Sequence, residues 1–235
     1  MKFPKFCSLL STQAMFFCRA DCFDDPWEGV WPKKYYDAKY WKKKLTSARP
    51  NLSSAEIKKR IDGIIDYFKH SYQNRSRLAV TCWHENPHEA ESFWKLYSNP
   101  KYGVAIKSTV GNLKKSIAKA DKEVYIGKID YLDLENDTFY KQDRYAAIQV
   151  KRKDFAHEKE VRAVIDRTTL NEDQSQFEQI NGTYLECNLN LLIDAIAVSP
   201  LAEEWFFNVV KDLTNKFGIK SKCYKSSLYE KPYYI

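Results

Sequence analysis

Five short apolar runs limit the folds open to this chain more than any other feature of the sequence. Each run is bounded by polar or turn-forming residues and is too short for a buried helix, so each is predicted to form a strand. The runs cover residues 14–20, 78–84, 102–109, 161–165 and 195–200. Helical stretches separate them without the strict alternation of a parallel fold. The pattern therefore predicts an α+β fold, with a mixed, mostly antiparallel sheet flanked by helices.

Three further elements have predicted bounds. Period-two alternation favours a long strand over 123–133, and a helix is expected over 138–150. The helix within PHEAESFWKLYS is expected to begin at Pro87, because Asn86 can cap it and Glu89 can complete a capping box.

The segment 32–77 is basic and is predicted to be mostly helical. Its clearest helix begins after Ser53, with Glu56 three residues later as the second half of a capping box. Apolar side chains then recur at helical spacing and define a buried face. We interpret 32–77 as a helical basic insert within a single domain that spans 1–235.

A run of lysines and aromatic residues, KKYYDAKYWKKK, lies at the start of this insert, in a chain whose net charge is +7. An anionic partner is therefore plausible, with phosphates contacting the lysines and bases stacking on the aromatic rings. The alternative is a solvated helix face. The lysines are Lys33, Lys34, Lys39, Lys42, Lys43 and Lys44.

The cysteines and the lengths of the apolar runs indicate the cellular compartment in which the protein is expected. Six cysteines form no CxxC pair, and the polar residues of the first segment do not resemble a signal peptide. No apolar run approaches the ~20 residues that a membrane-spanning helix requires. We expect a cytoplasmic protein with reduced thiols and no membrane association.

Metal and phosphate sites of common types are not expected. Cys82, His84 and His88 could ligate zinc, but a helix that begins between the histidines would place them on different faces. The DDPWEG loop, with Asp25 and Glu28, could hold a divalent cation or accept a hydrogen bond from a ribose; the alternative is an acidic turn paired with Arg19. Walker, GxGxxG and GxSxG motifs are absent from the sequence.

Two glutamates, Glu158 and Glu160, directly precede the predicted strand VRAVI (161–165). Arg162 follows two residues after Glu160. Arg162 could neutralise them as a structural pair. Alternatively, the order of Arg19, then Ser108 with Thr109, then Glu-x-Glu resembles the arginine-serine-glutamate class of ADP-ribosyltransferases.

That resemblance implies an enzyme that uses NAD to modify a macromolecular acceptor, as a toxin or an antiphage effector. It makes Glu160 the catalytic residue that stabilises an oxocarbenium-like cation, and Glu158 its acceptor-side partner. Arg19 would grip the phosphates and Ser108 would orient the site. The residues expected to bind the dinucleotide are Arg19, Asp25, Glu28, Trp83, His84, Ser108 and Thr109.

A second resemblance covers nearly the whole chain. The blocks CRADCFDDPWEG, TCWHENPHEAESFWKLYS, KRKDFAHEKEVRAVI and AIAVSPLAEEWF are similar, in order and spacing, to the bacterial and phage-borne domain of unknown function 2971. This resemblance implies a single cytoplasmic domain and supplies no activity. Family members usually begin with an additional strand bearing an Arg-Tyr pair, ahead of the segment that matches Phe3–Leu10. If that arginine grips the nucleotide, Arg19 does not have this role and the site is incomplete.

Two other functions remain open. One is a non-catalytic module that binds nucleic acid or protein through the lysine run, with Glu158, Glu160 and Arg162 as a structural charge network. The other is a metal-dependent nuclease built on Asp24, Asp25 and the glutamates, which would require magnesium or manganese.

Overall fold

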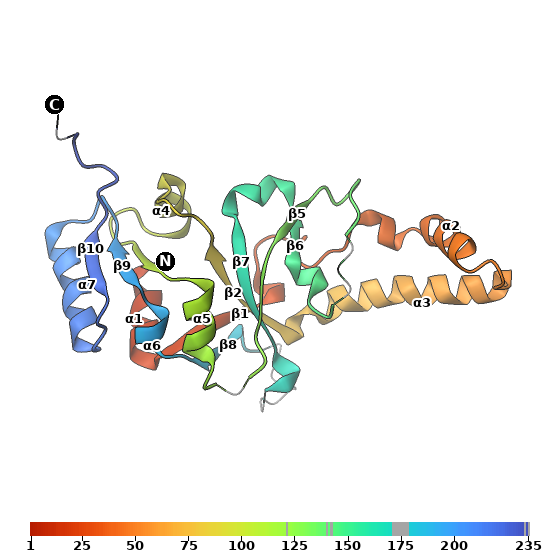
Figure 1. Cartoon of the computed structure of the whole chain (residues 1–235), viewed down its shortest axis with the longest axis horizontal. Helices are drawn as coiled ribbons and strands as arrows, with labels where there is room; N and C mark the ends of the chain where they lie inside the picture. Colours follow the sequence, from red (N-terminus) through yellow and green to blue (C-terminus); the bar gives the residue numbers. More distant parts are fainter. Residues whose placement is uncertain (121, 140, 142, 171–178, 233, 235) are drawn as a thin grey trace. The chain divides into compact units, whose positions relative to one another are not determined.

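The computed structural model describes residues 1–235 except 121, 140, 142, 171–178, 233 and 235 (Figure 1). The described chain divides into two units, each assembled from separated segments. Unit 1 comprises Met1–Phe16, Asn86–Asp121 and Tyr184–Ile235, and unit 2 comprises Phe17–Glu85 and Lys122–Thr183. Strands β1 (Ala14–Arg19) and β8 (Gly182–Glu186) therefore contribute residues to both. The single domain over 1–235 remains a prediction.

Unit 1 is built around a three-stranded sheet in the order β10-β9-β3, in which β9 pairs parallel with β10 and antiparallel with β3. Helix α7 ends before Gly218, whose φ of +68° suits a residue without a Cβ. The elements are α1 (Phe3–Thr12), α4 (Glu91–Tyr97), β3 (Val104–Lys107), α5 (Val110–Ile117), α6 (Leu189–Leu192), β9 (Ala195–Val198), α7 (Glu204–Lys216) and β10 (Lys222–Lys225).

Unit 2 contains the pairing that positions the candidate site. The five-stranded sheet has the order β4-β7-β2-β1-β8, and β2 is antiparallel to both β1 and β7. Its other elements are α2 (Ala38–Ala48), α3 (Ser54–Gln73), β2 (Leu78–His84), β4 (Tyr125–Lys128), β5 (Asp130–Leu132), β6 (Val150–Arg152) and β7 (Glu160–Asp166). The helices and mostly antiparallel sheets confirm the predicted α+β fold class.

Three predicted elements are wrong in their bounds. Helix α4 begins at Glu91 rather than Pro87, because the Asn86 side chain accepts from the His88 amide in a local turn. The strand over 123–133 is divided at Ile129: β4 pairs with β7, whereas β5 pairs with β6. Among the described residues of 138–150, only a 3-10 turn over Ala146–Gln149 is helical.

The basic segment forms two helices that pack side by side, α2 and α3 (Figure 1). The predicted capping box is present at the start of α3: the Glu56 amide donates to Ser53 Oγ at 3.3 Å, and the Ser53 amide donates to Glu56 Oε2 at 2.8 Å. Ile57, Ile61 and Phe68 are buried. Among the described residues, no helix combines the length and apolar character needed to cross a membrane.

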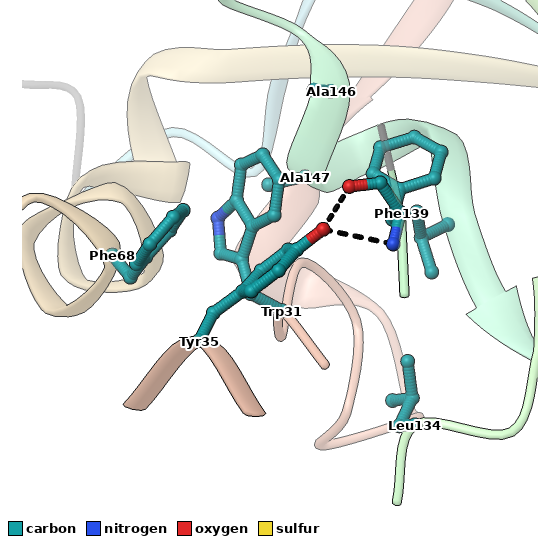
Figure 2. Close-up of a cluster of buried hydrophobic side chains, with 8 residues drawn as sticks. Trp31, Tyr35, Phe68, Leu134, Phe139, Ala146 and Ala147 are labelled. Carbon is teal, nitrogen blue, oxygen red and sulfur yellow. Dashed lines mark hydrogen bonds between the residues drawn. The ribbon is translucent and has the colours of Figure 1, made fainter. Parts of the chain in front are cut away.

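An aromatic cluster anchors the basic segment to the rest of unit 2. Figure 2 shows the Tyr35 hydroxyl directed at the backbone of Phe139: it donates to the Phe139 carbonyl and accepts from the Phe139 amide at 2.8 Å. The rings of Tyr35 and Phe68 stack with centroids 5.1 Å apart, and Trp31 lies beside them. The buried members of this aromatic cluster are Trp31, Tyr35, Phe68, Leu134, Phe139, Ala146, Ala147 and Val150.

Candidate functional site: a buried ion network in unit 2

Five charged side chains of unit 2 form a continuous set of ion pairs, which we call the ion network. Its members are Glu28, Lys151, Glu158, Glu160 and Arg162. Glu28 comes from the DDPWEG loop, Lys151 from β6, and Glu160 and Arg162 from β7. Glu158 ends a 3-10 turn, and Lys159 then adopts the left-handed conformation (φ 41°) before β7 begins.

Arg162 holds two carboxylates at once. Its Nη1 and Nη2 pair with the two oxygens of Glu28, with Nη2 3.1 Å from Oε2. Its Nε lies 2.7 Å from Glu160 Oε2, and Nη1 also donates to the Ile148 carbonyl at 2.9 Å. Lys151 Nζ pairs with Glu158 Oε2 and lies 3.3 Å from Glu160 Oε1. The ion network therefore runs from Glu28 to Glu158 without a break.

The ion network is withdrawn from solvent. Arg162 is 1% exposed and Glu28 is 3% exposed. Three carboxylates meet two cations, which leaves one negative charge in excess within the five residues. Burial lowers the pKa of the Lys151 ammonium, but its hydrogen bond to Glu158 and the charges of Glu160 and Glu158 outweigh burial and raise that pKa above its usual value. Lys151 is therefore a stable cation at neutral pH.

Polar and aromatic groups adjoin the two glutamates. The Glu160 amide donates to the Tyr131 hydroxyl at 2.8 Å, and His84 Nδ1 lies 2.5 Å from the Glu158 carbonyl oxygen. His84 stands directly opposite Glu160 in the pairing of β2 with β7. The neighbouring indole nitrogen, Trp83 Nε1, is buried and has no hydrogen-bond partner among the described residues.

Arg152 follows Lys151 in β6 and has partners outside the ion network. Its Nη2 lies 2.9 Å from Asp25 Oδ1, and its guanidinium lies 5.7 Å from the ring centre of Trp27 and 5.2 Å from that of Phe155. The Trp27 ring remains 43% exposed. Arg152 Nε is buried without a hydrogen-bond partner in the described part of the chain.

The structure brings together many of the residues predicted from sequence, but not Arg19. Arg19 pairs with Ala79 across β1 and β2, whereas Glu160 pairs with His84 across β2 and β7. His84 is five positions after Ala79, which corresponds to about 17 Å along the strand. Because both pairings are antiparallel, the end of β1 lies opposite the start of β2, whereas the start of β7 lies opposite the end of β2. Arg19 and Glu160 therefore lie at opposite ends of the paired strands, and the expected part of Arg19 in dinucleotide binding remains a prediction.

Local partners account for Arg19 and for the acidic loop. Arg19 Nε lies 2.6 Å from Asp21 Oδ1. Asp25 Oδ1 accepts from the Trp27 amide of the same loop at 3.1 Å, as the acidic-turn interpretation expected, and Asp25 also pairs with Arg152. Glu28 pairs with Arg162. Within the described residues, no three His, Cys, Asp or Glu side chains are grouped so as to hold a metal ion.

Ser108 and Thr109 belong to unit 1, where both make local contacts. Ser108 Oγ donates to the Leu192 carbonyl at 2.5 Å. Thr109 Oγ1 accepts from the Asn112 amide at 3.1 Å and caps α5. Their predicted part in dinucleotide binding remains a prediction.

Sequence reasoning missed Lys151, Arg152 and Tyr131. The two basic residues were assigned to no element, because a helix was expected to end at residue 150. A signal was present, since Lys151 and Arg152 precede the Glu-x-Glu pair by only a few residues. Tyr131 carried no such signal, because its contact with Glu160 depends on where β5 lies.

A comparison with protein-family models agrees with the resemblance seen in the sequence. Residues 93–163 match the family described as a protein of unknown function, DUF2971. This stretch includes most of α4, all of β3 and α5, and four of the five members of the ion network. Neither the comparison with curated proteins nor that with solved structures gives a match. The family is itself of unknown function.

Proposed function

We propose that unit 2 carries an NAD-dependent ADP-ribosyl transfer site centred on Glu160. The observation that carries this proposal is the convergence of Glu158 and Glu160 on Lys151 in a buried set of charges with one excess negative charge. A buried site with net negative charge favours a positively charged transition state, because little water is present to screen it.

The reaction has the electrostatic character that such a site would favour. The bond between the ribose C1′ and the nicotinamide nitrogen breaks, and its electron pair leaves with nicotinamide, whose ring loses its positive charge. Positive charge develops on the ribose, where the Glu160 carboxylate would stabilise it. A nucleophile of the macromolecular acceptor then forms the new bond to C1′ and releases its proton, which Glu158 would accept.

Arg152 is a better candidate than Arg19 for holding the phosphates. Its side chain is one-third exposed, its guanidinium lies 5.7 Å and 5.2 Å from the centres of the Trp27 and Phe155 rings, and its Nε has no partner among the described residues. Arginine suits phosphate oxygens because its donors form a planar fork. The exposed Trp27 ring would supply a stacking surface for one base of NAD.

Calorimetric titration with NAD, followed by measurement of released nicotinamide, tests the proposal. Wild type should bind and release nicotinamide, and Glu160→Gln should lower turnover at least about 100-fold while remaining folded by circular dichroism. Arg152→Ala should weaken NAD binding. Glu85→Gln is the matched control, because Glu85 is a neighbouring carboxylate in an exposed pair with Lys128, and this variant should behave like wild type. A folded wild type that neither binds NAD nor releases nicotinamide would refute the proposal.

One observation favours a second function, the non-catalytic binding module. Both oxygens of Glu160 already accept from cations, Oε1 from Lys151 and Oε2 from Arg162. If these bonds persist whenever partners bind, the ion network is structural, and binding must occur elsewhere on the surface.

A further inference from the structure

The structure divides the lysine run into two groups with different surroundings. Lys33 pairs with Glu135 at 2.5 Å, and Lys34 donates to the Asn136 carbonyl. The Lys44 ammonium lies 5.0 Å from the ring centre of Tyr40. These three lysines are engaged with neighbouring groups of unit 2.

The other three lysines line a hollow on the surface of α2. Lys39, Lys42 and Lys43 border it together with Thr46 and Ser47, and its volume is about 390 Å³. All five side chains are exposed. Their spacings of three and four residues place them on one helix face. No described carboxylate forms an ion pair with these three lysines, and none lines the hollow.

The aromatic residues of the same run point away from this face. Tyr36, Tyr40 and Trp41 pack against the aromatic cluster, and the Trp41 indole donates to the Tyr35 carbonyl at 2.9 Å. The sequence had suggested bases stacked between basic residues. For these rings that interpretation remains a prediction, but they pack against the aromatic cluster, where they are partly buried. The hollow therefore offers charge and hydroxyl groups without a stacking surface.

We propose that this hollow binds the sugar–phosphate backbone of double-stranded nucleic acid. Lysine, serine and threonine are common phosphate ligands, and such contacts carry no sequence information. Proteins that bind single strands rely on aromatic stacking, which this face lacks. Protein–protein interfaces are depleted in lysine, so an acidic protein is the weaker candidate. The inference is independent of the NAD chemistry at the ion network.

The test is fluorescence anisotropy with a short labelled duplex of random sequence, measured over a range of salt concentrations. With at most three lysine–phosphate contacts, the slope of log K against log salt should be no steeper than about −2.7. Lys42→Gln/Lys43→Gln should reduce the magnitude of that slope by about 1.8 and weaken binding at low salt. Lys33→Gln/Lys34→Gln removes the same charge from engaged residues and should leave the slope nearly unchanged.

Several outcomes would overturn the proposal. They are no duplex binding at low salt, tighter binding of a single strand of equal length, and equal losses in the two double variants. Competition by poly-glutamate as effective as that by unlabelled duplex would instead assign the hollow to acidic proteins. Circular dichroism of both double variants should match wild type, because the four substituted side chains are not part of the buried core.

Discussion

Removal of Arg162 should be among the most damaging single changes in unit 2. In Arg162→Met, Glu28 loses both of its ion-pair bonds, and Glu160 keeps only its 3.3 Å contact with Lys151. Three carboxylates, of which Glu28 and Glu158 are buried, would then face one ammonium. Breaking a buried ion pair by removing one partner costs about 3–5 kcal/mol, because a charge remains without compensation. The free energy of unfolding should therefore fall by about that amount.

Urea denaturation at neutral pH, followed by tryptophan fluorescence, measures this loss, and the slope m should stay unchanged. A double-mutant cycle with Glu28→Gln gives the sharper result. The double variant should lose less than the sum of the single variants, because removing Glu28 also removes the charge stranded by Arg162→Met. Lys33→Met serves as the control: its pair with Glu135 is exposed (71% and 56%) and screened by solvent, so the loss should be much smaller than that of Arg162→Met. Additive single losses, or a cost for Arg162→Met as small as that of the control, would refute the reasoning.

Three further changes test other parts of the structure. Ser53→Ala removes the side-chain acceptor of the α3 capping box and should destabilise the fold by about 1 kcal/mol in urea denaturation; no change would show that this bond contributes little. Tyr35→Phe leaves the buried Phe139 amide without its acceptor and should cost about 1–3 kcal/mol, and a neutral result would mean that the backbone re-pairs. Because the pKa of Lys151 is raised in the folded state, its protonation stabilises the fold fully below about pH 10.5, and this contribution is lost as the pH rises through the folded pKa. The difference in unfolding free energy between wild type and Lys151→Met should therefore shrink at alkaline pH, and a difference independent of pH would contradict this assignment.

Local patterns in the sequence were sufficient for the fold class and for several elements. The strand 78–84 and the helix that follows Ser53 form as predicted, because their signals are interactions between residues a few positions apart. The same kind of reasoning failed at Asn86, where the side chain stabilises a turn instead of a helix start. Capping residues can satisfy either conformation, and packing decides between them.

Local patterns of residues indicate that a charged Glu-x-Glu segment precedes a buried strand and that a lysine run lies near a well-capped helix. The partners of those charges follow from the fold. Glu28 meets Arg162 across 134 residues, and Arg19 lies at the other end of the paired strands from Glu160. Likewise, Lys33 is neutralised by Glu135, whereas Lys42 lines an open hollow. The physical reason is that short-range spacing sets secondary structure, whereas ion pairing depends on strand register and on which segments pack together.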